Sequence, residues 1–120
     1  MFDHIGVKVK DVEESARFYK AALGALGLVC SSQDASGAGF GPQGAPALWL
    51  NKSKEKAGGA HLAFKAKDRK AVDRFHAAGL DAGGKDNGKP GVRKDYAPNY
   101  YAAFLLDPDG NNIEAVCFKD

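Results

Sequence analysis

Three side chains that can bind a divalent metal ion stand far apart in this chain: His4, His61 and Glu114. Two neutral imidazoles and one carboxylate can occupy one face of such an ion and leave its other positions open to water or substrate. A glutamate among apolar strand residues is costly to bury unless it is paired or bound to a metal. These residue types predict a shared metal site, if the fold brings them together. Taken singly, each has a plainer alternative, a surface or hydrogen-bonded histidine and an exposed edge glutamate.

An internal repeat places both histidines at equivalent positions. With an offset of 57 residues, segment 4–11 lies over segment 61–68, and eight of the 20 aligned positions from residue 4 to residue 23 are identical. Each histidine opens a segment in which apolar residues alternate with others, the pattern of a half-buried strand. The alternation turns His4 and His61 away from the apolar residues, and it does the same for Glu114 near the end of the chain. The pattern therefore favours convergence of the three side chains.

The elements that must position these residues are the same in both halves. Asp11 and Asp68 each precede a segment with helical periodicity and suit its N-cap. Glycines at 24 and 27, and at 79 in the second half, are expected to end the helices. Short strands are then expected over residues 28–31, 37–41, 47–51, 100–106 and 112–118, with a turn at 107–110.

The sequence thus predicts one α+β domain over residues 1–120, built from two modules of one strand, one helix and about three strands. Module one spans about 1–56 and module two about 57–120, and we expect them to pack as a pseudo-twofold pair whose sheets curl around a cleft. Residues 81–99 are rich in Gly, Lys and Asp. We interpret them as a loop that can cover the cleft, with one short strand within it as an alternative.

Length and composition exclude several classes of protein. A chain of 120 residues with 44% apolar residues can form a core without disulfides. The net charge is +2 and the basic residues are scattered, which argues against a nucleic-acid partner. The longest apolar run, 100–106, is too short to span a membrane, and the amino terminus lacks a signal-peptide pattern. We therefore expect a soluble, cytoplasmic protein with no membrane partner.

The pattern resembles the vicinal oxygen chelate superfamily, which includes glyoxalase I, bleomycin-resistance proteins, fosfomycin-resistance thiol transferases, methylmalonyl-CoA epimerases and extradiol dioxygenases. The resemblance covers essentially the whole chain. Its residues are 3–9, Ser15, Phe18, Tyr19, 59–64 and, most specifically, 104–114. It implies paired βαβββ modules that form a curled mixed sheet around a cleft, and a homodimer. It also implies one divalent metal per site (Mn, Fe, Zn, Ni or Co) with His4, His61 and Glu114 as ligands.

The activity implied by the resemblance is a metal-dependent reaction on a small substrate with adjacent oxygens, with lyase, isomerase, thiol transferase and dioxygenase chemistry all open. The fourth-strand ligand of glyoxalase I falls on Leu48 or Trp49 here. Neither can bind a hard divalent ion, so we do not expect glyoxalase I itself. The resemblance also leaves open whether the site lies within one chain or uses the first histidine of a dimer partner.

Four further residues are candidates for binding substrate: Trp49, Arg93, Tyr96 and Tyr101. A cation beside several phenols suits an anionic or enediolate-like substrate, although a core tryptophan and a solvated loop are the plainer interpretation. No protein group is assigned as general base. His76 aligns with a helical tyrosine in the repeat and is interpreted as structural or exposed.

Two rival functions remain. One is a metal-free small-molecule binding protein of the bleomycin-resistance type, with an apolar cleft lined by Trp49, Phe40, Phe104 and Tyr101. The other is a dimeric domain with no small-molecule role, whose cleft is filled by its own side chains. Bound metal would favour the enzyme over both.

Overall fold

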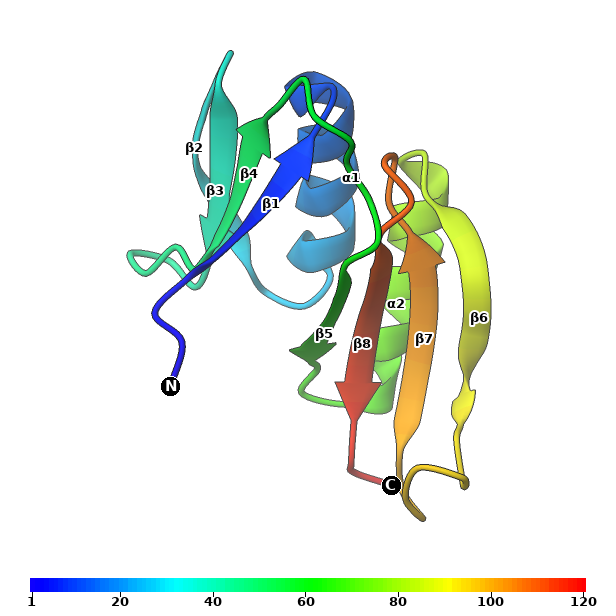
Figure 1. The fold of residues 1–120 in the computed structure, drawn as a ribbon. Coiled ribbons are helices and arrows are strands. Elements are labelled where there is room, and N and C mark those ends of the chain that lie inside the picture. Colours follow the sequence, from blue (N-terminus) through cyan, green and yellow to red (C-terminus); the bar gives the residue numbers. More distant parts are fainter.

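Two units with the same order of elements make up residues 1–120, which the computed structural model describes in full (Figure 1). The first contains β1 (Ile5–Val9), α1 (Val12–Gly24), β2 (Val29–Asp34), β3 (Gly37–Gly41) and β4 (Leu48–Lys52). The second contains β5 (His61–Lys65), α2 (Arg69–Asp81), β6 (Lys85–Val92), β7 (Tyr101–Leu106) and β8 (Asn112–Cys117). The predicted α+β fold of paired βαβββ modules is confirmed.

Each module forms a mixed sheet of its own. The strand order is β1-β4-β3-β2 in the first sheet and β5-β8-β7-β6 in the second. The first strand of each module runs parallel to the last, and the other pairs are antiparallel. In Figure 1 the two sheets stand side by side with both helices behind them. β1 and β5 each stand at one end of the strand order, so they are edge strands that pair on one side only.

The helices cover one face of each sheet and pack against each other. Val7 and Val9 of β1 are buried on the helix side, whereas Lys8 between them is exposed. The other face of each sheet, turned away from its helix, is called the open face below. Neither helix is long and apolar enough to cross a lipid bilayer.

The predicted helix starts are confirmed, whereas one predicted end is wrong. Asp11 accepts a hydrogen bond from the backbone nitrogen of Glu14 at 3.1 Å, and Asp68 does the same for Ala71 at 2.8 Å. Gly79 does not end α2, which continues to Asp81. A Cβ atom at position 79 would lie 2.3 Å from Cδ1 of Leu105. Glycine is needed there because α2 approaches β7 closely.

Segment 81–99, interpreted from the sequence as a loop with one short strand as an alternative, contains the eight-residue edge strand β6. Its pairing with β7 is interrupted by register shifts between Asp86 and Gly88 and between Gly88 and Gly91. Glycine, proline and bulges are typical of an edge strand, where few ladder bonds are needed. The composition of this segment favours a loop, whereas pairing with β7 makes Lys85–Val92 a strand.

The predicted turn at 107–110 has a second role, which is to join the modules. Asp109 accepts hydrogen bonds from the backbone nitrogen of Lys10 at 3.2 Å and from Oγ of Ser15 at 3.3 Å. Buried Asp107 accepts a 2.5 Å hydrogen bond from the hydroxyl of Tyr19 on α1. Burial and the negative charge of Asp107 raise the pKa of Tyr19 far above its usual value, so this phenol stays a donor.

Candidate functional site

Two of the three predicted metal ligands meet on the open face of the second sheet. In the parallel pair of β5 and β8, Ala63 lies opposite Glu114 and His61 opposite Asn112, so His61 and Glu114 share one face. The Nε2 atom of His61 lies 2.9 Å from Oε1 of Glu114. The carboxylate side chain is 2% exposed and the imidazole 54% exposed. The pair thus joins a buried acid to a solvent-accessible base.

The second oxygen of Glu114 is engaged by Tyr100, whose hydroxyl donates a hydrogen bond to Oε2. Burial, together with the hydrogen bond and negative charge of Glu114, raises the pKa of Tyr100 to about 12. The phenol is therefore protonated at neutral pH and remains a donor. No lysine or arginine pairs with Glu114, whose only ionisable partners are a histidine and a phenol.

Tyr100 stands at the start of the predicted strand 100–106, and sequence reasoning did not connect this residue with Glu114. The strand parity contained a signal, because Tyr100 precedes Phe104 by four residues and so falls on the same face. Phe104 is the cross-strand partner of Glu114. The register between β7 and β8 was needed to see that the three are neighbours.

His4 does not join this pair within one chain. It precedes β1, its side chain is 59% exposed, and its Nδ1 atom lies 2.7 Å from Oδ1 of Asp3. No group of three or more histidine, cysteine, aspartate or glutamate side chains in the chain is placed to hold a metal ion. The structure therefore assembles two thirds of the predicted ligand set.

Two of the four candidate substrate-binding residues lie close to this pair. The Cζ atom of Arg93 is 5.4 Å from the ring centre of Phe104. The ring of Tyr96 makes an edge contact with that of Tyr100 at 5.0 Å between centroids. Both residues therefore stay candidates for the same surface.

The other two candidates lie elsewhere. The hydroxyl of Tyr101 donates to Asp73 of α2 at 2.6 Å, so this side chain is on the helix side of the second sheet. Trp49 is on the open face of the first sheet, where its ring covers Gly39. Leu48, the other position weighed for a fourth ligand, is buried on the helix side.

An apolar cavity of about 570 Å³ lies where the first sheet meets β5. Its walls include Phe2, Ile5, Phe40, Leu48, Leu62 and Phe64, and His61 lies at its border. Of the four residues expected to line an apolar cleft, only Phe40 does so. Trp49, Phe104 and Tyr101 are on three different surfaces, as described above.

The chain resembles proteins of one family along its whole length. A family model described as a glyoxalase-like domain matches residues 4–116. A glyoxalase/bleomycin resistance protein from Albidiferax ferrireducens is 35% identical, with a TM-score of 0.84 over 98% of each chain.

More distant structures share the fold. A glyoxalase/bleomycin resistance protein/dioxygenase family enzyme from Burkholderia phytofirmans is 18% identical, with a TM-score of 0.74 over 98% of each chain. A glyoxalase-related enzyme from Fulvimarina pelagi is 19% identical, with a TM-score of 0.73 over 94% of this chain and 84% of its own. No curated protein matches the chain.

Proposed function

Because the chain belongs to the glyoxalase-like domain family, we propose that it is a divalent-metal-dependent enzyme that acts on a small substrate with two adjacent oxygens. The observation that carries this proposal is the contact between His61 and the buried carboxylate of Glu114. Lyase, isomerase, thiol transferase and dioxygenase chemistry all remain open. The absence of a ligand at Leu48 and Trp49 argues against glyoxalase I itself.

The donor atoms suit a metal of the Mn, Fe, Zn, Ni or Co type. An imidazole nitrogen and a carboxylate oxygen are ligands that these ions accept. The two atoms are 2.9 Å apart, close to the separation of about 3 Å expected for neighbouring ligands that each lie about 2.1 Å from an ion. A carboxylate that is 2% exposed and lacks a lysine or arginine partner is also stabilised by a bound cation.

The third ligand proposed is His4 from a second copy of the chain. The His4 side chain is exposed in the single chain. The nearby apolar residues Phe2 and Ile5 are also exposed, by 72% and 38%. The edge strands β1 and β5 each have one unpaired side. A homodimer in which β1 of one copy lies beside β5 of the other would cover these groups and bring His4 towards His61 and Glu114. The site would then be shared across the dimer.

The chain's own groups have separate roles in this proposal. A bound metal supplies Lewis acidity that polarises a carbonyl or stabilises a developing alkoxide or enolate. His61 and Glu114 would hold it, and Tyr100 would orient Glu114 by donating to Oε2. Tyr100 acts through Glu114 and is therefore a positioning residue. No side chain is assigned as a proton acceptor from the substrate.

The experiment that tests this proposal is a titration of the metal-free protein with Mn(II), Fe(II), Zn(II) and Ni(II), combined with elemental analysis of protein purified without chelators. We expect about one ion per chain in the wild type. His61→Ala and Glu114→Gln should weaken binding by at least about 100-fold, since even partners that only orient a metal ligand are worth about 10- to 100-fold in affinity.

A matched control for these variants is Glu13→Gln, which changes an exposed carboxylate in the first turn of α1. Its metal affinity should equal that of the wild type. Stoichiometric binding that survives in both His61→Ala and Glu114→Gln would refute the proposed ligands, and absence of specific binding would refute metal dependence.

The second candidate function is metal-free binding of a small apolar molecule, which the 570 Å³ apolar cavity favours. Cavities of this size accept drug-sized ligands. Under this alternative, ligand binding survives EDTA and is weakened by filling the cavity, for example with Ala47→Phe, but not by His61→Ala. The enzyme proposal predicts that binding of an oxygen-chelating ligand is lost with EDTA.

A further inference from the structure

Arg93 is a half-buried cation that has no acidic partner. Its Nη1 atom donates to the carbonyl oxygen of Gly91 at 2.9 Å, and Nη2 donates to that of Lys89 at 2.6 Å. Neither interaction neutralises the guanidinium, and Arg93 is absent from all five ion pairs of the chain. The positive charge of Arg93 therefore remains available to an anionic ligand.

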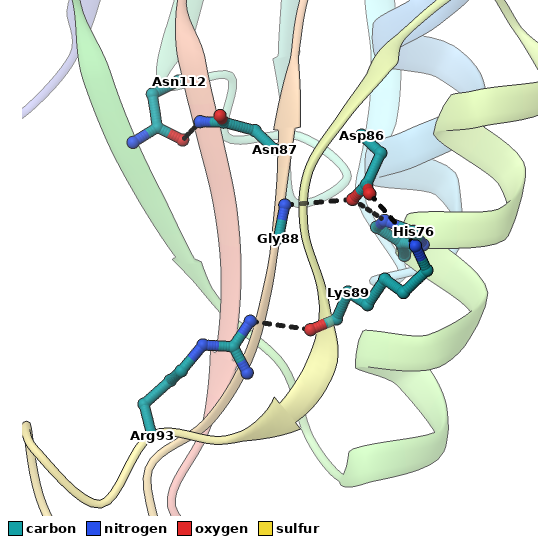
Figure 2. A network of polar contacts seen from close by, with 7 residues as sticks. All are labelled: His76, Asp86, Asn87, Gly88, Lys89, Arg93 and Asn112. Carbon is teal, nitrogen blue, oxygen red and sulfur yellow. Dashed lines mark hydrogen bonds and ion pairs between the residues drawn. The ribbon is translucent and has the colours of Figure 1, made fainter.

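The bulged strand β6 fixes where this guanidinium lies. Figure 2 shows Asp86 turned towards α2, where its Oδ1 atom is 2.9 Å from Nε2 of His76, while the next residue, Asn87, points to Asn112 on the other side of the strand. Asp86 also accepts from the backbone nitrogen of Gly88 at 3.0 Å. The path of β6 is therefore anchored to α2 immediately before the bulge that leads to Arg93.

Gly88 leaves room for the guanidinium above Phe104. A Cβ atom at position 88 would lie 2.7 Å from Cδ1 of Phe104 and 3.3 Å from Nη2 of Arg93. Because glycine stands there, Arg93 reaches over the aromatic ring with its Cζ atom 5.4 Å from the ring centre. Two carbonyl hydrogen bonds and this ring contact hold the guanidinium in place before any ligand binds.

Phe104 links Arg93 to the candidate metal ligands. It is the cross-strand partner of Glu114, and its ring centre lies 6.4 Å from that of His61. Arg93 and His61 therefore lie beside the same aromatic ring on the open face of the second sheet. A ligand of a few carbon atoms that rests on Phe104 can contact both.

We propose that Arg93 binds a carboxylate of the substrate whose adjacent oxygens would bind the metal held by His61 and Glu114. The substrate class is then a small organic acid with two adjacent oxygens at one end and a carboxylate at the other. This inference rests on the proposed function for its link to the metal ligands. A guanidinium has five N–H donors, of which two are used by carbonyl groups, so enough remain for a two-point contact with a carboxylate.

The test compares two probes that differ in the distal carboxylate alone. 2-Oxoglutarate and 2-oxopentanoate share adjacent oxygens at one end, and the first carries a second carboxylate at the other. Calorimetric titration of the Mn(II)-loaded protein should give about tenfold tighter binding of 2-oxoglutarate, as expected for a charge-assisted contact at a partly exposed site.

Variants assign this preference to one residue. Arg93→Gln should remove it, and Arg93→Lys should recover only part of it because lysine cannot make a two-point contact. The control Lys94→Gln removes the neighbouring exposed cation and should keep the full preference. Equal binding of the two probes by the wild type, binding of neither, or a preference that survives Arg93→Gln would overturn the proposal.

The same probes separate this proposal from the proposed function. Manganese affinity is measured first, and Arg93→Gln should leave it unchanged because Arg93 contributes no ligand. If the wild type binds none of Mn(II), Fe(II), Zn(II) and Ni(II), metal dependence fails. The two probes are then compared in the metal-free protein, where glutarate serves as a third probe; a carboxylate preference that depends on Arg93 supports the anion subsite, and its absence overturns it.

Discussion

His61 and Glu114 are 53 positions apart in the chain, yet the Nε2 atom of the first lies 2.9 Å from Oε1 of the second. Parallel pairing of β5 with the central strand β8 produces this contact, because it turns both side chains to the open face of the second sheet. Tyr100 completes the surroundings of the carboxylate from the other side. The arrangement connects the repeat, which supplies the histidine, with the closing hairpin, which supplies the acid.

Tyr100 and its neighbour Tyr101 offer a matched pair of hydroxyl deletions. We expect Tyr100→Phe to lower the free energy of unfolding by about 1 kcal/mol, because it leaves one oxygen of a buried carboxylate without its donor. Tyr101→Phe removes a hydrogen bond to the exposed Asp73 and should cost less. Urea denaturation of the three proteins measures the difference, and an equal cost for both would contradict this role of Tyr100.

The Asp107 carboxylate should contribute more than any exposed acid of the chain. It accepts from the Tyr19 hydroxyl and from both the backbone and side-chain nitrogens of Asn111, and it is 4% exposed. Asp107→Ala leaves these donors unpaired at the contact between the modules, which should cost about 3 kcal/mol. Asp95→Ala, on an exposed loop, is the control and should change stability little. Chemical denaturation checks both variants.

The ionised Asp86 carboxylate should make the stability of the folded protein sensitive to acid. Hydrogen bonds from His76 and from the backbone of Gly88 lower the pKa of Asp86 from 3.8 to about 2 in the folded protein. A lowered pKa means that the stabilisation is present above pH 3.8 and is lost as the pH falls towards 2.

The measurement for Asp86 is urea denaturation at about pH 5 and about pH 2.5. The wild type should lose more stability between these conditions than Asp86→Asn, which has no carboxylate to protonate. Other carboxylates titrate in both proteins, so the difference between them is the readout. An equal loss of stability in the two proteins would show that the contact of Asp86 with His76 gives no net stabilisation.

Replacing either of two helical glycines with alanine should change the stability of the protein, in opposite directions. Gly79→Ala places a methyl group 2.3 Å from Cδ1 of Leu105 and should cost about 2 kcal/mol through overpacking. Gly24, the last residue of α1, has no atom within 4 Å of the added Cβ. Gly24→Ala should therefore stabilise the protein by about 0.5 kcal/mol through reduced chain entropy. Thermal unfolding gives both signs, and a neutral Gly79→Ala would contradict the close packing of α2.

Local patterns were enough to predict much of this fold. The repeat around His4 and His61, and the caps Asp11 and Asp68, correctly predicted both modules and the starts of both helices. For residues 81–99 the alternative of a strand within a loop was correct, because pairing of β6 with β7 outweighs a composition typical of loops. Gly79 was misleading, since contact with Leu105 and not chain termination requires a glycine there.

The candidate site was predictable to the extent that strand parity determines it. Parity correctly placed His61 and Glu114 on one face. The contact of Tyr100 with Glu114 depends on the register of β7 with β8, which alternation does not specify. The position of His4 relative to the other two depends on how the two sheets lie, and no local pattern encodes that. For the same reason the two hydrogen bonds that Asp109 makes to the first module could not be anticipated.

The most direct test of the shared metal site is metal binding by a heterodimer of His4→Ala and His61→Ala chains, prepared by co-expression with two different affinity tags. If His4 of one chain acts with His61 and Glu114 of the other, one of the two sites in this heterodimer contains both mutations and the other contains neither. We predict about one tightly bound ion per heterodimer, of a metal that the wild type binds, and none in either mutant homodimer. A heterodimer that does not bind the ion that the wild type binds, or a wild-type chain that stays monomeric while it binds the metal, would contradict a site shared between two chains.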